Sequence, residues 1–352
     1  RNYLLTAWKV FMRRKLFTAI NLLCIVLALV VLMVATALLE HAFSPSGVEG
    51  KSDRFLQVLT MKAVTVDDKM RRSSSVGYRL IDTYLKPLKS VETVAVLTMP
   101  RSVSVYQDGR VSDLEMRRVD AQYWKVLDFT LLAGRLPTAD DDDAGRFVAV
   151  INASSARKLF PGAAAVGQSL NAGGQVFEVI GVVEDALHLN AYADIWTPIT
   201  TLPSSDYKLQ SWGEFSALLL AKDAAGLPAV RKEVEAVAAT VQLEGPLHWG
   251  KVNFWADSKI DLFARMTVGS ASRADSGAGT LLAMIAVAML LFMLLPALNL
   301  VNLNMGRIME RSTEIGVRKA FGATSTDLVA QLVVENVLLC LAGGVLGLLC
   351  AQ

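Results

Sequence analysis

The sequence is poor in cysteine and in charged residues. Only three cysteines occur among 352 residues, and all three (Cys24, Cys340 and Cys350) lie inside apolar segments. No disulfide framework can therefore hold the polar part of the chain together. A polar segment of more than two hundred residues can bury enough core without disulfides, so an oxidising compartment is not excluded. Charged residues make up 19% of the chain, below the roughly 25% that is usual in soluble proteins.

The chain also lacks the usual catalytic and metal-binding motifs. His41, His188 and His248 are far apart, and no H-E-x-x-H, G-x-S-x-G or Walker-type phosphate loop occurs. The acidic run 140–143, followed by Gly145, lacks the spaced ligands and closing Glu of a Ca²⁺ loop, so we expect a solvated acidic loop. The net charge is +2, without a basic patch interleaved with aromatics. We expect no bound metal or cofactor, no nucleic-acid partner and no enzymatic activity of the chain itself.

What the chain does contain is three long apolar segments. Residues 17–39 include no charged residue, and a helix of this length spans about 35 Å, enough to cross a hydrocarbon core of about 30 Å. Residues 281–303 and 328–350 are similarly apolar, and Gly343 and Gly347 share one helix face in the last segment. We predict transmembrane helices at 17–39, 281–303 and 328–352, the third of them truncated. A cleaved signal peptide is the alternative for the first, but its apolar stretch is too long.

The flanking charges predict the orientation. Residues 1–16 combine an apolar stripe with basic residues and are expected to form an amphipathic helix on the cytoplasmic face. Basic residues also cluster beside the first two spans: Lys9, Arg13, Arg14 and Lys15 before the first, and Arg307, Arg311, Arg318 and Lys319 after the second. Because positive clusters stay cytoplasmic, residues 41–279 should lie outside and residues 304–327 inside.

The outer segment 41–279 carries mixed strand and helix patterns. We expect an α+β domain, arranged in two lobes. An Asp-Gly turn at 108–109 predicts a hairpin, and Asn152 is suited to cap a short helix that ends near Phe160. Further expected elements are an alternating strand at 56–60, a mostly buried strand at 93–97, a buried strand at 147–151, another strand at 176–183, a turn at 172–175, and helices near 76–89 and 227–241.

The inside loop is the most informative segment. Glu310, Glu314 and Arg318 are spaced so that they can brace one face of a helix. Gly322 is a natural helix stop. A merely positive membrane flank would explain the basic residues, but neither the two glutamates nor the Gly-Ala ending. We therefore predict a short, rigid helix that receives a push from a cytoplasmic partner.

These residues closely resemble the MacB/FtsX-like permeases, the type VII ABC transporters. Their E-R-x-x-E-I-G-x-R-[KR]-A-x-G-A loop is matched without a gap over residues 310–323. The outer segment resembles the MacB-type periplasmic core at 123–127, 132–135, 150–152, 159–162, 166–168 and 179–183, and less clearly at 184–279. The resemblance assigns ATPase coupling to Glu310, Arg311, Glu314, Ile315, Gly316, Arg318, Lys319, Ala320, Phe321, Gly322 and Ala323.

The resemblance implies a four-span permease of the bacterial inner membrane that works as a dimer with two cytoplasmic ABC ATPase subunits, in which ATP and Mg²⁺ bind. The fourth span and a fused ATPase domain are missing from this sequence; we attribute the first to truncation and expect a partner or a missing segment to supply the second. The dimer could pair identical or related permeases, and a periplasmic adaptor and an outer-membrane channel are further candidate partners.

Two functions follow from the resemblance. The leading interpretation is mechanotransmission: ATPase closure moves the periplasmic domain and thereby exports or extracts a peptide-like, lipoprotein or hydrophobic substrate. The alternative is a non-transporting mechanotransducer that regulates a periplasmic partner such as a cell-wall hydrolase. A membrane-tethered sensor is disfavoured, because a sensor needs neither the coupling loop nor a third span.

Overall fold

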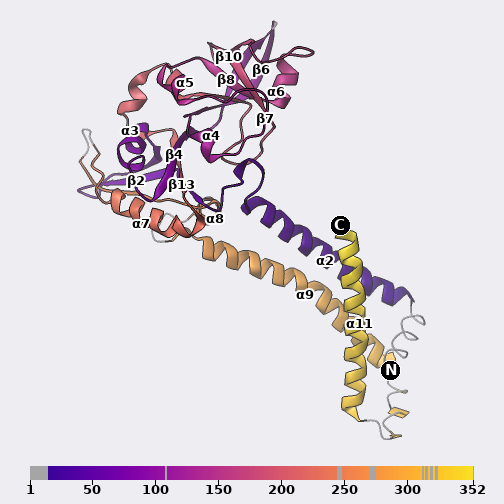
Figure 1. Cartoon of the computed structure of the whole chain (residues 1–352). Coiled ribbons are helices and arrows are strands. Elements are labelled where there is room, and N and C mark those ends of the chain that lie inside the picture. Colours follow the sequence, from indigo (N-terminus) through magenta and orange to yellow (C-terminus); the bar gives the residue numbers. More distant parts are fainter. Residues whose placement is uncertain are drawn as a thin grey trace. The chain divides into compact units, whose positions relative to one another are not determined.

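The computed structural model describes residues 15–107, 109–243, 248–269, 275–310 and 324–351, together with residues 313, 316, 317, 320 and 321. The contacts divide the chain into two units, one built of long helices and one formed by Phe43–Ala278 (Figure 1). The predicted amphipathic helix at 1–16 lies almost entirely outside the described residues.

The helical unit contains three long helices: α2 (Lys15–Phe43), α9 (Ala278–Glu310) and α11 (Ser325–Ala351). Among the described residues, two stretches are long and apolar enough to cross a membrane, Thr18–Phe43 and Ala278–Leu295. In α11 the apolar stretch is shorter, Asn336–Leu349. The first two predicted spans therefore coincide with suitable helices, and the third span and the total number of spans remain predictions.

The glycines of α11 allow a close approach within one chain. A Cβ atom added to Gly343 would lie 2.6 Å from Cγ2 of Ile25 in α2, and one added to Gly347 would lie 3.3 Å from Cβ of Leu29. A side chain at Gly343 would therefore force the two helices apart. The shared glycine face packs inside the chain.

The second unit is an α+β domain, as predicted. Its strands are β1 (Phe55–Val58), β2 (Thr60–Thr65), β3 (Arg71–Val76), β4 (Val91–Thr98), β5 (Arg101–Gln107), β6 (Arg110–Val119), β7 (Leu131–Gly134), β8 (Val148–Asn152), β9 (Ser169–Ala172), β10 (Gln175–Val183), β11 (Ile195–Pro198), β12 (Trp212–Gly213), β13 (Phe215–Ala221) and β14 (Trp249–Phe254). Its helices are α3 (Tyr78–Leu80), α4 (Tyr123–Val126), α5 (Ala139–Asp143), α6 (Ala153–Leu159), α7 (Leu227–Ala238) and α8 (Lys259–Val268), with short helical turns η1 (Gly47–Glu49), η2 (Ile81–Leu85), η3 (Ile199–Thr201), η4 (Ser205–Leu209) and η5 (Ala224–Gly226).

Six strands close into a small barrel. The hydrogen-bonded order β6-β5-β9-β10-β8-β11 returns to β6, because β11 pairs with both β8 and β6. Side chains at alternate positions fill its interior, among them Leu114 and Met116 of β6 and Phe177 and Val179 of β10. Small barrels are filled by inward side chains in this way.

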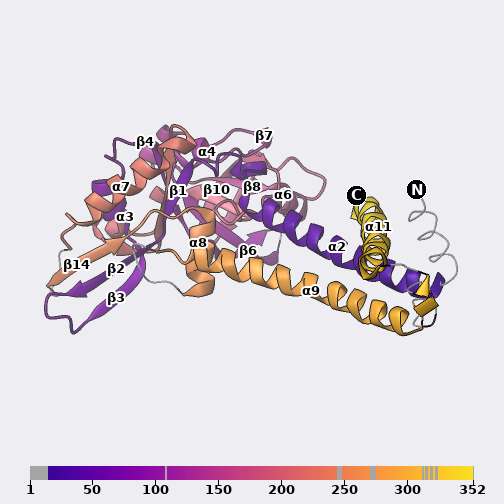
Figure 2. The same cartoon turned by 90° about the horizontal axis from the view of Figure 1, so that it is seen from below.

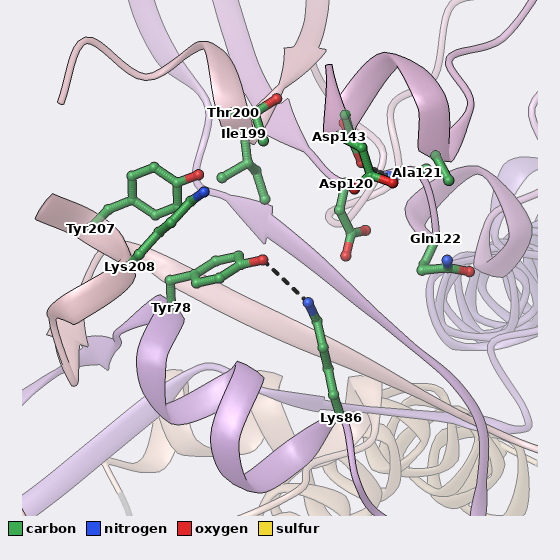
Figure 3. A pocket seen from close by; sticks show the side chains of 12 residues that line it. Tyr78, Lys86, Asp120, Ala121, Gln122, Asp143, Ile199, Thr200, Tyr207 and Lys208 are labelled. Atoms are coloured by element: carbon green, nitrogen blue, oxygen red, sulfur yellow. Dashed lines mark hydrogen bonds between the residues drawn. The ribbon is translucent and has the colours of Figure 1, made fainter. Parts of the chain in front are cut away.

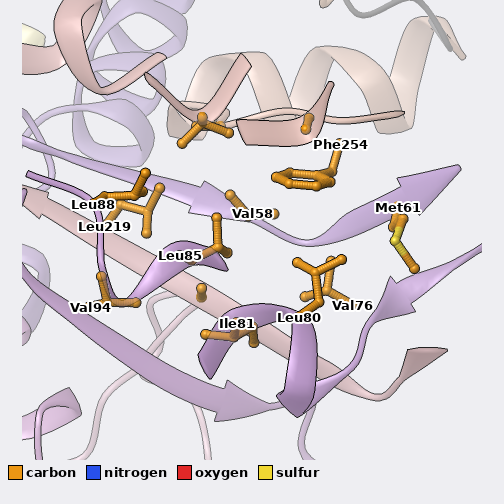
Figure 4. Close-up of a cluster of buried hydrophobic side chains, with 14 of the residues drawn as sticks. Val58, Met61, Val76, Leu80, Ile81, Leu85, Leu88, Val94, Leu219 and Phe254 are labelled. Carbon is orange, nitrogen blue, oxygen red and sulfur yellow. The ribbon is translucent and has the colours of Figure 1, made fainter. Parts of the chain in front are cut away.

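The remaining strands form an open sheet beside the barrel. Its order is β4-β13-β3-β2-β14, with β1 paired to β13. In Figure 2 β2, β3 and β14 lie side by side at the end of this sheet. Figure 4 shows the apolar core of this part, where α3 and η2 supply Leu80, Ile81 and Leu85 and strands supply Val76 and Phe254.

A third apolar cluster, which includes Trp124, Trp196 and Leu218, draws on both the barrel and the open sheet. The pairing of Leu97 in β4 with Val119 in β6 continues one sheet through both parts. Residues 43–278 thus form one compact unit. The predicted two-lobe arrangement is not confirmed.

Most local predictions are confirmed. Strands β5 and β6 form the predicted hairpin, with Gln107 opposite Arg110. The Asn152 side chain accepts a hydrogen bond from the Ser155 N–H (2.7 Å) and caps α6. Strands β9 and β10 meet at the predicted turn, where both glycines have positive φ.

Two expectations at the start of the domain need correction. The single alternating strand at 56–60 is wrong, because β1 and β2 are separate strands and all of β1 is buried. Both faces of β1 are covered, so alternation was the wrong pattern to expect. The helix expected at 76–89 is shorter and covers residues 78–85 as α3 and η2.

Candidate functional site

The predicted coupling loop lies largely outside the described residues. Helix α9 ends at Glu310, but nothing is described of that side chain or of Arg311, Glu314, Ile315, Arg318, Lys319, Gly322 and Ala323. Gly316 and Ala320 are exposed and helical, and the Phe321 N–H donates to the carbonyl of Val317 (3.1 Å). The Phe321 side chain is 88% exposed. The described positions thus include an exposed aromatic residue at the end of a helical turn, and the coupling role remains a prediction.

A second candidate site is the junction, defined here as Phe43–Gly50 and Asp257–Ala278 without residues 270–274. Here the chain passes from α2 into the domain and from the domain into α9. Helix α8 is its centre. Ser258 and Asp261 form a capping box at the N-terminus of α8, and Gly269 ends the helix in the left-handed conformation.

The segment that follows α2 is fastened to α8. Phe43, the last residue of α2, packs edge-to-face on Phe263 with ring centroids 5.6 Å apart. Six residues later, the Glu49 carboxylate forms an ion pair with the Lys259 ammonium (2.6 Å). The Glu49 side chain is only 1% exposed and that of Lys259 only 12%. Removing one partner of such a buried ion pair strongly destabilises the folded protein, because the other charge is left buried without a counter-charge.

Glu49 also connects the junction to the barrel. Its second carboxylate oxygen accepts a hydrogen bond from the Asn190 N–H (3.0 Å). The carbonyl of Asn190 accepts hydrogen bonds from the Arg117 guanidinium (2.8 Å) and from the Tyr123 hydroxyl (2.8 Å). Arg117 lies on β6 and is 2% exposed, and burial lowers the pKa of its guanidinium. A continuous polar chain therefore runs from α8 into a barrel strand.

The segment that precedes α9 is fastened to α8 as well. The Ser276 hydroxyl donates to Asp261 (2.6 Å), and Arg265 donates to the carbonyl of Asp275 (3.3 Å). Asp261 also pairs with Arg231 of α7 (2.6 Å). Burial opposes ionisation of Asp261, but hydrogen bonds from Ser258, Ser276 and Arg231 lower the pKa of its carboxyl to about 2. Helix α8 thus contacts both the segment that follows α2 and the segment that precedes α9.

A polar pocket of about 270 Å³ opens elsewhere in the domain. Figure 3 shows the Lys86 side chain reaching the Tyr78 hydroxyl on one side of it and the Asp120 carboxyl opposite. The Lys86 ammonium donates to that hydroxyl (3.2 Å) and to Asp82 (2.8 Å). Its walls come from η2, the β6–α4 connection, α5, η3 and η4.

Two carboxyls of the pocket have raised pKa values. Burial, with the nearby charge of Asp142 in addition, raises the pKa of Asp120 to about 7. Burial also raises the pKa of Asp142 to about 6, although its carboxylate accepts a hydrogen bond from the Ala121 N–H (2.5 Å). The pocket therefore carries less negative charge at neutral pH than its composition suggests.

The expected solvated acidic loop at 140–143 is wrong. These residues form α5, and the Asp141 side chain is fully buried. It accepts two hydrogen bonds from Arg135 (2.6 and 3.0 Å) and one from Arg146 (3.0 Å). The hydrogen bonds from Arg135, above all, lower the pKa of the Asp141 carboxyl. Asp141 is a structural anion inside a two-arginine clamp.

The glycine beside Arg135 explains part of this local pattern. Gly134 has a positive φ of 77°, and a Cβ there would lie 2.1 Å from the carbonyl oxygen of Ile180. Only glycine allows β7 to approach β10 this closely. The Leu-Ala-Gly-Arg segment at 132–135 thus combines a close strand approach with the arginine that holds Asp141.

Comparison with known proteins identifies the family. A family model described as the MacB-like periplasmic core domain matches residues 18–237. Another, the FtsX-like permease C-terminal model, matches residues 286–351. The chain belongs to the MacB/FtsX-like ABC transporter permeases. The two matched regions, a periplasmic core and a permease region, indicate a membrane protein with a periplasmic domain.

Individual relatives match less than their full length. The chain is 31% identical to the "Probable export ATP-binding/permease protein MacB" of Pseudomonas entomophila, over 67% of this chain and 34% of that protein. It is 27% identical to the "Probable syringafactin export ATP-binding/permease protein SyfD" of Pseudomonas syringae pv. tomato, over 90% and 51%. This permease therefore spans about a third to a half of the length of these relatives.

Among solved structures, the match with the periplasmic region of MacB from Actinobacillus actinomycetemcomitans covers 64% of this permease and 98% of the solved chain. The two are 18% identical, with a TM-score of 0.46.

Sequence reasoning missed the junction. The capping-box spacing of Ser258 and Asp261 was a readable signal for the start of α8. Nothing local marks Glu49 and Lys259 as partners, because they are far apart in the sequence. Likewise, an acidic run on its own indicates solvent exposure, and only Arg135 and Arg146 together explain why Asp141 is buried.

Proposed function

We propose that this chain is the permease subunit of an ATP-driven type VII ABC exporter that works by mechanotransmission. Closure of two cytoplasmic ABC ATPase subunits, which hold ATP and Mg²⁺, would push on residues 310–323. The membrane helices would then pass the motion to the periplasmic domain of a permease dimer. The matched permease models and the export function in the relatives' names support this assignment.

The junction is the observation that carries the proposal. Mechanotransmission requires a rigid connection between the outer ends of the spans and the domain, so that a movement of a span also moves the domain. Helix α8 binds the chain after α2 through Phe43 and Glu49, and the chain before α9 through Asp275 and Ser276. The Glu49–Lys259 and Ser276–Asp261 contacts are short (2.6 Å each), at least partly buried and charge-assisted, and charge-assisted hydrogen bonds are the strongest class. A shift of either segment would therefore move α8 and, through Asn190, the barrel.

The proposed substrate is peptide-like, a lipoprotein or otherwise hydrophobic. The named relatives are export proteins, which favours transport over regulation of a cell-wall hydrolase. A periplasmic adaptor and an outer-membrane channel complete the proposed set of partners.

The test is to purify the tagged full-length chain from native membranes and to identify what accompanies it. We expect an ABC ATPase in equal amount and a peptide-like or amphipathic compound that ATP releases. Absence of any ATPase would contradict the proposal. An ATPase together with a peptidoglycan hydrolase, and no releasable compound, would replace transport by regulation.

The topology has a separate test. A cysteine at Ser204, an exposed residue of the domain, should react with a membrane-impermeant thiol reagent in spheroplasts. A cysteine at Ser312 should react only after the membrane is permeabilised. The opposite pattern would reverse the proposed orientation.

A further inference from the structure

The polar pocket of the domain has walls of opposite charge. Two tyrosines and two lysines form the basic wall, which consists of Tyr78, Lys86, Tyr207 and Lys208. Three carboxyl groups form the acidic wall, which consists of Asp120, Asp142 and Asp143. The side chains of the two walls that Figure 3 labels lie on opposite sides of the pocket. A ligand in this pocket therefore meets a positive side and a negative side.

The two walls do not neutralise each other. Lys86 is paired with Asp82 (2.8 Å) and donates a hydrogen bond to the Tyr78 hydroxyl (3.2 Å). The Lys208 ammonium lies over the Tyr207 ring, 6.0 Å from its centroid. In the part of the chain that the structure describes, no ion pair connects either lysine to a carboxyl group of the acidic wall. The acidic wall and Lys208 therefore keep charges that a ligand can pair with.

Two polar atoms of residues that line the pocket also lack a partner. One carboxyl oxygen of Asp142 accepts a hydrogen bond from the Ala121 N–H (2.5 Å). The other oxygen of Asp142 and the hydroxyl of Thr200 are buried and have no hydrogen-bond partner among the described residues. Buried polar atoms without a partner cost free energy, and in folded proteins nearly all of them pair with a protein group, water or a ligand. The pocket is therefore suited to a polar ligand.

The size of the pocket limits this ligand to a small molecule. Its volume is about 270 Å³, below the range of about 300–1,000 Å³ that is typical of sites for drug-sized ligands. An edge-to-face contact of the Tyr78 and Tyr207 rings, with centroids 5.1 Å apart, holds the basic wall in place. Burial raises the pKa of the Tyr207 hydroxyl to about 12, so this group remains a hydrogen-bond donor at neutral pH. The space is that of an amino acid or a dipeptide.

We propose that this pocket binds a small zwitterion of amino-acid or dipeptide size, with its ammonium group on the acidic wall and its carboxylate on the basic wall. Charge-assisted hydrogen bonds of this kind are the strong ones. The basic wall belongs to α3, the end of η2 and η4, and the acidic wall to α5 and the residue after β6. A bound zwitterion would therefore link these elements. The inference does not depend on the proposed export function, because it concerns binding by the domain alone.

Proton release is a second signature of this binding mode. Burial raises the pKa of Asp120 to about 7, so its carboxyl is partly protonated near pH 7 without a ligand. An ammonium group beside it favours the charged carboxylate, and binding should therefore release a proton. The titratable and charged groups that face Asp120 across the pocket are Asp142 and Asp143 of α5, Lys86 after η2, Tyr78 of α3, and Tyr207 and Lys208 of η4.

The test is isothermal titration calorimetry of the purified full-length chain in detergent. The zwitterionic probes are L-alanine and L-alanyl-L-alanine. The matched control ligands are N-acetyl-L-alanyl-L-alanine, which has no ammonium group, and L-alanyl-L-alanine amide, which has no carboxylate. We expect at least one zwitterion to bind, and each blocked dipeptide to bind about tenfold or more weakly than the zwitterion, because one charged contact is lost. The heat of binding should differ between phosphate and Tris buffers near pH 7, since a proton is released.

Two variants test the walls separately. Asp120→Asn should weaken binding of the zwitterion and reduce the preference for a free ammonium group, whereas the preference for a free carboxylate remains. Lys208→Gln, at an exposed position, should have the reverse effect on the two preferences. Asp53→Asn removes an exposed carboxyl that does not line the pocket and should leave binding unchanged. Melting temperatures show whether each variant folds, and Lys208→Gln decides if Asp120→Asn does not.

Three results would overturn the proposal. The first is that neither zwitterion binds. The second is that a blocked dipeptide binds as tightly as the zwitterion, because the pocket would then recognise only one charge. The third is that Asp120→Asn and Lys208→Gln both keep the affinity and the preferences of the wild type, because the ligand would then bind elsewhere.

Discussion

Glu49 and Lys259 form a buried ion pair that joins the segment after α2 to α8, the short helix before α9. The same carboxylate accepts the N–H of Asn190, whose carbonyl is held by Arg117 of the barrel. One carboxylate therefore connects three parts of the chain that are far apart in the sequence. These contacts fasten residues 43–50 to α8 and to the barrel within the domain.

Lys259→Met should destabilise the domain by about 3 kcal/mol, because it leaves the Glu49 carboxylate buried without a counter-charge. The double variant Glu49→Gln with Lys259→Met should recover most of that loss, since neither side chain is then charged. Thermal unfolding in detergent measures both effects. Lys251→Met is the matched control, because Lys251 is an exposed lysine of β14. Equal melting temperatures for Lys259→Met and Lys251→Met would show that the pair does not stabilise the junction.

Asp141→Asn should also destabilise the domain by about 3 kcal/mol, because Arg135 and Arg146 lose a fully buried anion. Asp140→Asn, on the exposed face of the same helix, should change the melting temperature little. The pKa of Asp141 is lowered in the folded state. Its contribution is therefore present above about pH 4 and is lost as the pH falls below the pKa of an unfolded Asp, near 3.9. A stability difference that persists unchanged at pH 3 would contradict this assignment.

The polar pocket should have the opposite pH dependence. The raised pKa of Asp142, about 6, means that the folded state holds a proton more tightly than the unfolded state. Because of this group, the free energy of unfolding falls as the pH rises from about 4 to about 6 and stays lower at higher pH. Asp142→Asn should match the wild type near pH 4 and melt at a higher temperature at pH 7.5. The same scan with Asp140→Asn is the control, and parallel curves for wild type and Asp142→Asn would refute the raised pKa.

How far the sequence predicts this molecule depends on the range of each interaction. The Asn152 cap and the β5–β6 hairpin follow from a few neighbouring residues, and both are confirmed. The apolar segments at 17–39 and 281–303 likewise predict long helices, and long apolar helices are found there. Closure of the barrel depends on β11 meeting β6, a pairing that no local pattern encodes.

The sequence predicted least well which charged side chains are buried. A lone Glu49 resembles any surface glutamate, and its burial depends on Lys259 and Asn190, which arrive from other parts of the fold. The acidic residues of α5 look alike in sequence, yet Asp141 is buried and Asp140 is exposed. The coupling role of residues 310–323 stays a prediction, because the charged side chains of this loop lie outside the described residues.

The chain by itself should not hydrolyse ATP, because its sequence contains no phosphate loop. The measurement is phosphate release by the purified permease in detergent and in vesicles, with and without an added ABC ATPase subunit. Turnover by a preparation that mass spectrometry shows to be free of other subunits would contradict the prediction.

The most direct test of mechanotransmission is charge reversal in the inside loop. Glu314→Lys alters pairing on the loop helix by only a few tenths of a kcal/mol, too little to unfold the protein. A misplaced charge at a docking surface weakens a partner interaction much more. Gly322→Leu should act differently, by removing a residue that permits a left-handed helix stop. Glu178→Lys, an exposed reversal in the periplasmic domain, is the matched control.

The deciding measurement is substrate-stimulated ATPase activity of the assembled complex, normalised to membrane abundance, together with function in cells. The account predicts that Glu314→Lys and Gly322→Leu lose both at normal abundance, whereas Glu178→Lys keeps both. Normal stimulation and normal function of both loop variants at normal abundance would mean that residues 310–323 are only a charged membrane flank, and would contradict the proposed coupling.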